Sequence, residues 1–129
     1  ENSGLLTVAA LKQIKDKGKK VVCILSGGNM DVITMSSVVQ QGLIMRERIF
    51  TVSVLLPDRP GELSRVAGVI AKESGNVIKL EHNQFVSINR NAAVELRITL
   101  EAFGHEHKHQ IIDALEKNGY SPKLVRTNI

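Results

Sequence analysis

Aromatic residues are scarce in this chain: they make up 3% of its 129 residues, and tryptophan is absent. Proteins that bind single-stranded nucleic acid stack bases on aromatic side chains along a basic groove. The net charge of +4 is mild, and the basic residues form no long run. We therefore expect no nucleic-acid partner, and the lack of exposed aromatics in the clearest strand disfavours RNA binding in particular.

Cysteine and long apolar runs are also scarce. Cys23 is the single cysteine, which excludes an internal disulfide framework and suits a reducing compartment. No stretch approaches the roughly 20 apolar residues that a membrane-spanning helix needs. We expect a cytoplasmic protein without a membrane partner.

The first third of the chain predicts a helix, a buried strand, a glycine turn and a second helix. Residues 4–17 form the first helix, whose first half is apolar on nearly every side, as in a helix surrounded by protein. The continuous apolar run at residues 21–25 predicts a strand buried on both faces. A helix over residues 31–41 ends at Gly42. This pattern is typical of the closing unit of an α/β domain, so we expect the chain to be a C-terminal fragment.

The remaining two thirds predict a small α+β module. Alternating or periodic apolar residues predict strands over residues 49–56, 76–86, 93–102 and 120–125 and helices over residues 61–74 and 106–118. Asn89, Arg90 and Asn91 predict a polar hairpin turn. The order βαββαβ, with one polar sheet face, is the ferredoxin-like arrangement. Many unrelated functions use this fold, so it does not decide the function.

One turn dominates this module. Pro57 and Pro60 exclude regular structure between them, and Gly61 frees the backbone where a helix begins. The N–H groups at such a helix start favour a carboxylate or a phosphate. An ordinary strand-to-helix connection is the alternative, and the residues alone do not decide between the two.

The turn resembles the signature loop of the ACT domain family, small βαββαβ modules that bind amino acids and regulate enzymes. The run Asp58, Arg59, Pro60, Gly61, Glu62 and Leu63 carries the resemblance, which covers roughly residues 48–125. It implies an amino-acid effector on the backbone of these six residues, with Asp58 on the amine. It also implies that Asn76 of a second module completes the site, and hence a homodimer or a higher homo-oligomer. Alternatively, Asp58 caps the helix and Asn76 follows a turn.

The first third resembles a second family. The run from Val21 to Asp31 is similar to the last core strand and loop of the threonine dehydratase and serine racemase group of pyridoxal-phosphate enzymes. The resemblance implies that Ser26 hydrogen-bonds the pyridine nitrogen of the cofactor and that Gly27 lets the backbone pass close to the ring. Without it, Ser26 simply caps a turn.

The order of the two matched segments resembles that of threonine dehydratases with one ACT domain. Such an enzyme converts L-threonine to 2-oxobutanoate and ammonia, and its pathway suggests isoleucine or valine as effector. We expect residues 1–47 to be the catalytic tail with a linker, and residues 48–129 to be the ACT domain. The alternative is an ACT module that only assembles subunits.

Catalytic residues are not expected within this chain. The resembled family places its Schiff-base lysine in a Ser-Phe-Lys-x-Arg-Gly context and holds the phosphate with a four-glycine loop, and neither is present. We expect no bound cofactor and no turnover. His105, His107 and His109 cluster before the last helix, but without cysteine they favour a solvated helix start, so no metal site is expected.

Overall fold

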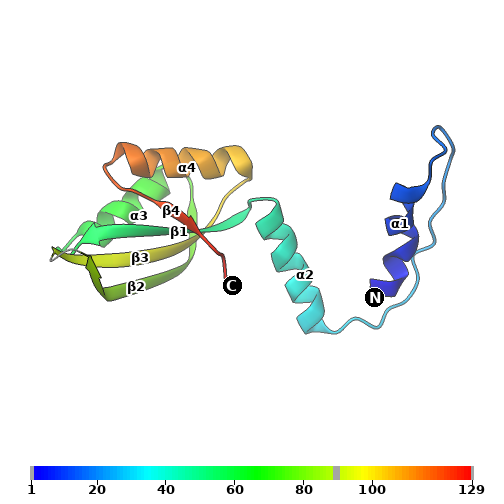
Figure 1. The fold of residues 1–129 in the computed structure, drawn as a ribbon, viewed down its shortest axis with the longest axis horizontal. Helices are drawn as coiled ribbons and strands as arrows, with labels where there is room; N and C mark the ends of the chain where they lie inside the picture. Colours follow the sequence, from blue (N-terminus) through cyan, green and yellow to red (C-terminus); the bar gives the residue numbers. More distant parts are fainter. Residues whose placement is uncertain (1, 89–90, 129) are drawn as a thin grey trace. The chain divides into compact units, whose positions relative to one another are not determined.

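The computed structural model of the protein describes residues 2–88 and 91–128. The chain forms two compact units, Glu1–Val39 and Gln40–Ile129 (Figure 1). The predicted domain boundary after residue 47 is a different division and stays a prediction.

The first unit begins with helical turns that end earlier than expected. η1 (Asn2–Leu5), α1 (Leu6–Ala10) and η2 (Leu11–Gln13) follow one another, and Ile14 is already extended. The predicted helix to residue 17 was therefore too long. Within the predicted range, Lys12 and Lys15 would lie three residues apart on one face of the helix, and neighbouring like charges disfavour a helix.

The prediction of a strand at residues 21–25 was wrong. These residues belong to no strand, and their apolar side chains are largely exposed, as at Val22 (89%) and Ile24 (75%). The segment bonds instead to α1: the Thr7 hydroxyl donates to the Ile24 carbonyl over 3.3 Å. A strand needs neighbouring backbone to pair with, and the described part of this unit supplies none.

Helix α2 (Val32–Met45) spans the boundary between the two units. It begins with a capping carboxylate, because Asp31 Oδ1 accepts from the Thr34 amide over 2.7 Å. It continues through Gly42, which we had expected to end it. It ends instead in two capping bonds, from Arg48 N to the Leu43 carbonyl and from Glu47 N to the Ile44 carbonyl, both 2.9 Å.

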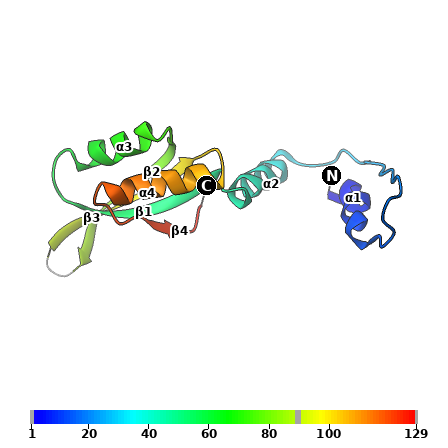
Figure 2. The same cartoon turned by 90° about the horizontal axis from the view of Figure 1, so that it is seen from above.

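The second unit contains one four-stranded antiparallel sheet in the order β2-β3-β1-β4. Its strands are β1 (Ile49–Pro57), β2 (Asn76–Ile88), β3 (Asn91–Glu101) and β4 (Lys123–Val125). Figures 1 and 2 show α3 (Glu62–Lys72) and α4 (His105–Lys117) on the same face of the sheet. The ferredoxin-like βαββαβ fold is confirmed.

The bounds of the last elements differ little from those expected. β4 starts at Lys123 instead of residue 120, because the Tyr120 amide bonds to the Leu115 carbonyl at the end of α4 and Pro122 has no N–H. Of the predicted hairpin turn, Asn91 begins β3, whereas Asn89 and Arg90 lie outside the described residues.

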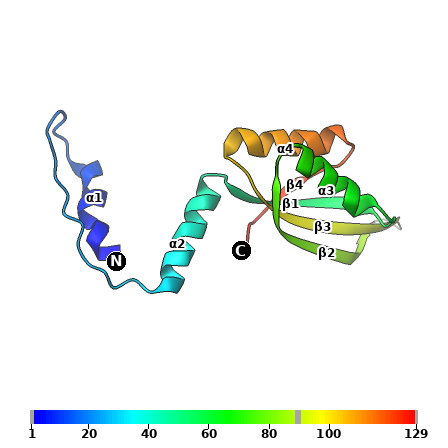
Figure 3. The same cartoon turned by 180° about the vertical axis from the view of Figure 1, so that it is seen from behind.

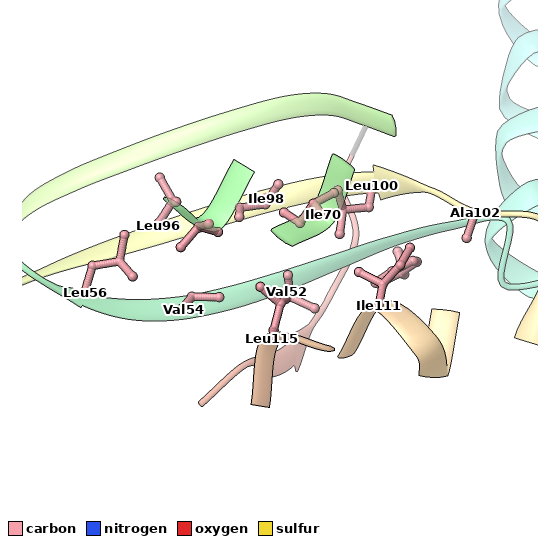
Figure 4. Close-up of a cluster of buried hydrophobic side chains, with 12 residues drawn as sticks. Val52, Val54, Leu56, Ile70, Leu96, Ile98, Leu100, Ala102, Ile111 and Leu115 are labelled. Carbon is pink, nitrogen blue, oxygen red and sulfur yellow. The ribbon is translucent and has the colours of Figure 1, made fainter. Parts of the chain in front are cut away.

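The core lies between the sheet and the two helices (Figure 4). Alternate residues of β1 and β3 meet the buried stripes of α3 and α4, in a cluster of Phe50, Val52, Val54, Leu56, Val66, Ile70, Leu96, Ile98, Leu100, Ala102, Ile111 and Leu115. Gly75 lies close against it, since a Cβ there would come within 2.8 Å of Ile70 Cγ2. This core fixes the directions of β1 and α3, and therefore the loop between them.

The other sheet face is polar, as predicted. Glu95 Oε1 accepts from the Ser53 hydroxyl over 2.7 Å and from Arg97 Nε over 3.0 Å. These contacts join β1 to β3 on the face without helices.

Candidate ligand-binding loop

The loop at residues 58–63 follows β1 and leads into α3, which begins at Glu62. The Arg59 amide donates to the Pro57 carbonyl over 2.8 Å, closing the turn. Gly61 precedes α3 with φ of +91°, a region that side chains disfavour. A Cβ at Gly61 would meet nothing within 4 Å, so the backbone angle, and not crowding, requires glycine here.

The start of α3 presents open amides. The Glu62 amide donates to the Arg59 carbonyl (3.4 Å) and the Arg65 amide to the Gly61 carbonyl (3.0 Å). Between them, the amides of Leu63 and Ser64 meet no backbone carbonyl of the described residues, and no side chain caps this helix. With the positive end of the helix dipole, they favour an anionic group.

A pocket of about 320 Å³ lies against this loop. Its walls come from residues 56–63, from His82 on β2 and from Val94 on β3. They combine apolar surface with both signs of charge, the latter from Asp58 and Arg59. A small amino acid carries a carboxylate, an ammonium and a side chain, so an apolar amino acid matches this mixture chemically.

Asp58 and Asn76 have different surroundings. Asp58 lines the pocket and does not cap α3, so the capping alternative is not observed. Asn76 lies at the opposite end of the sheet: it pairs with Glu101, which also pairs with Ile49 at the start of β1, whereas the loop follows the end of β1. Asn76 Nδ2 donates to Glu101 Oε2 over 3.2 Å. One copy of the chain therefore does not bring Asn76 to the loop.

Glu62 is held within the module. Its side chain is 15% exposed and lies 3.6 Å from the Arg65 guanidinium. Its Oε2 also accepts from the Tyr120 hydroxyl over 3.4 Å. Burial, followed by the nearby Glu62 charge, raises the pKa of Tyr120. These contacts tie the start of α3 to the segment after α4.

His82 and Val94 are wall residues that the sequence analysis did not select. The alternation that places Leu80 on the helix-covered face also places His82 there, but only the pairing of β2 with β3 brings His82 close to the loop. His82 pairs with Leu96, and the register shifts directly afterwards, between Asn83 and Val86. The shift interrupts the regular pairing beside the pocket, and the pairing resumes at Val86.

Ser26 and Gly27 belong to the first unit. The Ser26 carbonyl packs directly on Gly4, where a Cβ would lie 1.7 Å from that oxygen. Gly27 has φ of +91°. Their proposed part in cofactor binding stays a prediction.

The histidine cluster makes structural contacts. His107 Nδ1 accepts from the Phe103 amide over 3.0 Å and its Nε2 lies 2.5 Å from the Glu73 carbonyl, while His105 contacts Glu47. Within residues 2–88 and 91–128, no group of three metal-type side chains is arranged to hold an ion. No helix in that part of the chain is long and apolar enough to cross a membrane.

The fold and the loop together define a ferredoxin-like module with a pocket of ligand size at a helix start. A family model of the ACT domain matches residues 50–119. The chain belongs to the ACT domain family.

Relatives extend the similarity to nearly the whole chain. An L-threonine ammonia-lyase of Geobacter sulfurreducens is 38% identical over 122 residues, covering 93% of this chain and 30% of the relative. One from Thermotoga maritima is 31% identical over 126 residues, covering 97% and 31%. An L-threonine dehydratase biosynthetic IlvA of Staphylococcus aureus is 32% identical over 96 residues, covering 73% and 23%.

The resemblance to threonine dehydratase with an ACT domain is thus confirmed. The chain spans about three tenths of the length of the two ammonia-lyases that it matches.

Proposed function

We propose that this chain is the amino-acid-sensing regulatory region of a cytoplasmic threonine dehydratase, which converts L-threonine to 2-oxobutanoate and ammonia. The alignment of threonine ammonia-lyases with 93% and 97% of the chain supports the parent activity. The pocket at the 58–63 loop supports the sensing role.

Each part of an amino acid has a counterpart in the pocket. Its carboxylate accepts from the amides of Leu63 and Ser64, which lack backbone partners among the described residues. Its ammonium pairs with Asp58. An apolar side chain, as in isoleucine or valine, packs against Leu63 and Val94. Arg59, Pro60, Gly61 and Glu62 shape the loop and complete the site.

A second copy of the chain completes the assembly. β2 is an edge strand (Figure 3), and Val77, Ile78 and Leu80 on it are 38%, 44% and 41% exposed. An exposed edge with apolar side chains favours pairing with another strand. We expect a homodimer or a higher homo-oligomer in which Asn76 of one copy completes the binding site at the 58–63 loop of another.

Pyridoxal phosphate is the cofactor of the proposed parent, and this chain fits it only in part. Ser26 offers a hydroxyl for the ring nitrogen. The backbone at Gly28 is open, since a Cβ there would meet nothing within 4 Å. The Schiff-base lysine and the phosphate loop are absent from the sequence. The chain alone should therefore release no 2-oxobutanoate from threonine and added cofactor; detectable product would contradict this expectation.

Assembly without sensing is the second candidate, favoured by the exposed apolar edge of β2. Calorimetric titration with isoleucine, valine, threonine and serine separates the two. Sensing predicts heat of binding for at least one amino acid and weaker binding by Asp58→Asn. Asp113→Asn, an exposed carboxylate change on α4, is the matched control and should bind normally. If folded protein gives no heat of binding with any of the four amino acids, the result would support assembly alone.

A further inference from the structure

The turn between α2 and β1 contains a residue type that its backbone disfavours. Glu47 has φ of +55° and follows the last residues of α2 in the left-handed position of a helix cap. Glycine is the usual residue there, because a Cβ is costly in this region.

The chain uses glycine or a small residue at the comparable positions. α4 is followed by Gly119 with φ of +86°, and α3 by Ser74 with φ of +60°. Within the described residues, Glu47 and Ser74 are the non-glycine positions with positive φ. A large charged side chain at such a position suggests a compensating contact.

Glu47 makes that contact with the first turn of α4. Its Oε1 lies 2.7 Å from Lys108 Nζ, and its Oε2 contacts His105 Nδ1. The Lys108 side chain is only 11% exposed, and Nζ lies 5.9 Å from the centre of the Phe50 ring. An ammonium so enclosed depends on its counter-charge, so removing Glu47 would leave it unpaired.

Several basic side chains lie near Glu47 in space or in the chain. His109 packs against the His105 ring, Arg46 and Arg48 flank Glu47 in the chain, and Arg126 lines the same cavity as Glu47 and Lys108. Glu47 is the one acid in this set. Hydrogen bonds from Lys108 and then from His105 hold its pKa below the ordinary value.

We propose that Glu47 is a positioning residue, a clasp that holds the last turn of α2 on the first turn of α4. Its carboxylate is the link by which a displacement of α4 reaches the turn that connects α2 to the sheet. A role of this clasp in regulating the parent enzyme rests on the proposed function. The contact of Glu47 with α4 itself requires no ligand.

Hydrogen exchange of this chain tests the clasp directly. The amides of Arg46 and Arg48 report on the α2 cap, since they bond to the Gly42 and Leu43 carbonyls. In Glu47→Gln and Glu47→Gly we expect both amides to exchange about tenfold faster or more, as in local opening, while the β3 amides of Leu96 and Ile98 keep their rates. Ser74→Gly is the matched control: it relaxes a similar backbone angle, and the α2 cap should be unaffected.

Equal or slower exchange at Arg46 and Arg48 in Glu47→Gly would overturn the proposal, because the residue would then be an ordinary cap under strain. If a variant also loses protection in β3, the unmutated chain provides the second test. Lowering the pH through the depressed folded-state pKa of Glu47 protonates its carboxylate and should speed exchange at the two cap amides relative to the amides of Leu96 and Ile98. Unchanged relative rates would likewise contradict the clasp.

Discussion

The hydroxyl oxygens of Thr51 and Thr99 lie 2.9 Å apart, across β1 and β3, on the sheet face without helices. Both residues are nearly buried, at 6% and 4% exposure. They are flanked in register by Val125 on β4 and Lys79 on β2. The polar face thus contains a small enclosed hydrogen bond between its two central strands.

Removing one hydroxyl of this pair should cost more than removing both. Thr99→Val leaves the Thr51 hydroxyl buried without its partner, which costs ~1–3 kcal/mol of unfolding free energy. The double variant with Thr51→Val removes both polar groups and keeps two β-branched residues, so it should recover most of the loss. Urea denaturation of the unmutated protein, the two single variants and the double variant measures this, and a double variant as unstable as the sum of the singles would contradict it.

Acid should destabilise the second unit through its paired carboxylates. Hydrogen bonds from Ser53 and then Arg97 lower the pKa of Glu95, and those from Lys108 and His105 lower that of Glu47. A lowered folded-state pKa gives stability that is present above the unfolded value, near 4.5, and is lost as pH falls through the folded value. The melting temperature should therefore fall below about pH 4.5, with a shallower fall in Glu95→Gln. An equally steep fall in that variant would remove Glu95 from this account.

Alanine substitutions at two glycines, one before α3 and one within it, should change stability in opposite directions. Gly61 has φ of +91°, so Gly61→Ala strains the loop and should lower both stability and amino-acid affinity. Gly68 lies within α3, exposed and with nothing within 4 Å of a Cβ, so Gly68→Ala should stabilise the helix by about 1 kcal/mol without affecting binding. Thermal melts and titrations of both variants measure this, and normal binding by Gly61→Ala would show that the loop conformation does not matter.

His82 should matter for binding and little for stability. It is exposed on β2 and lines the pocket, so His82→Ala should weaken amino-acid binding while the melting point stays close to that of the unmutated protein. His109→Ala removes an exposed imidazole on α4 and serves as the control. If the two variants bind equally well, His82 is not part of the site.

The sequence correctly predicted the elements whose buried residues recur at a regular spacing along the chain. Leu96, Ile98 and Leu100 alternate with charged or polar residues, and β3 follows this alternation because one face meets the core. Gly61 likewise predicted the start of α3 within one residue, since its left-handed backbone angle requires that residue type.

Pairing and register could not be read from local pattern. Residues 21–25 are apolar enough for a buried strand, yet a strand forms only beside another strand, which local composition does not reveal. Asn76 is a polar residue at a strand start, but its distance from the loop follows from the direction of β2 in the sheet. His82 enters the pocket through the pairing of β2 with β3, which the alternation alone does not specify.

Amide chemical-shift mapping in solution tests the central claim, amino-acid binding at the 58–63 loop, most directly. The account predicts that isoleucine or valine shifts the amides of Leu63 and Ser64 most, and that Asp58→Asn diminishes these shifts at equal ligand concentration. If isoleucine, valine, threonine and serine all leave those two amides unshifted in the folded protein, the proposed site is contradicted.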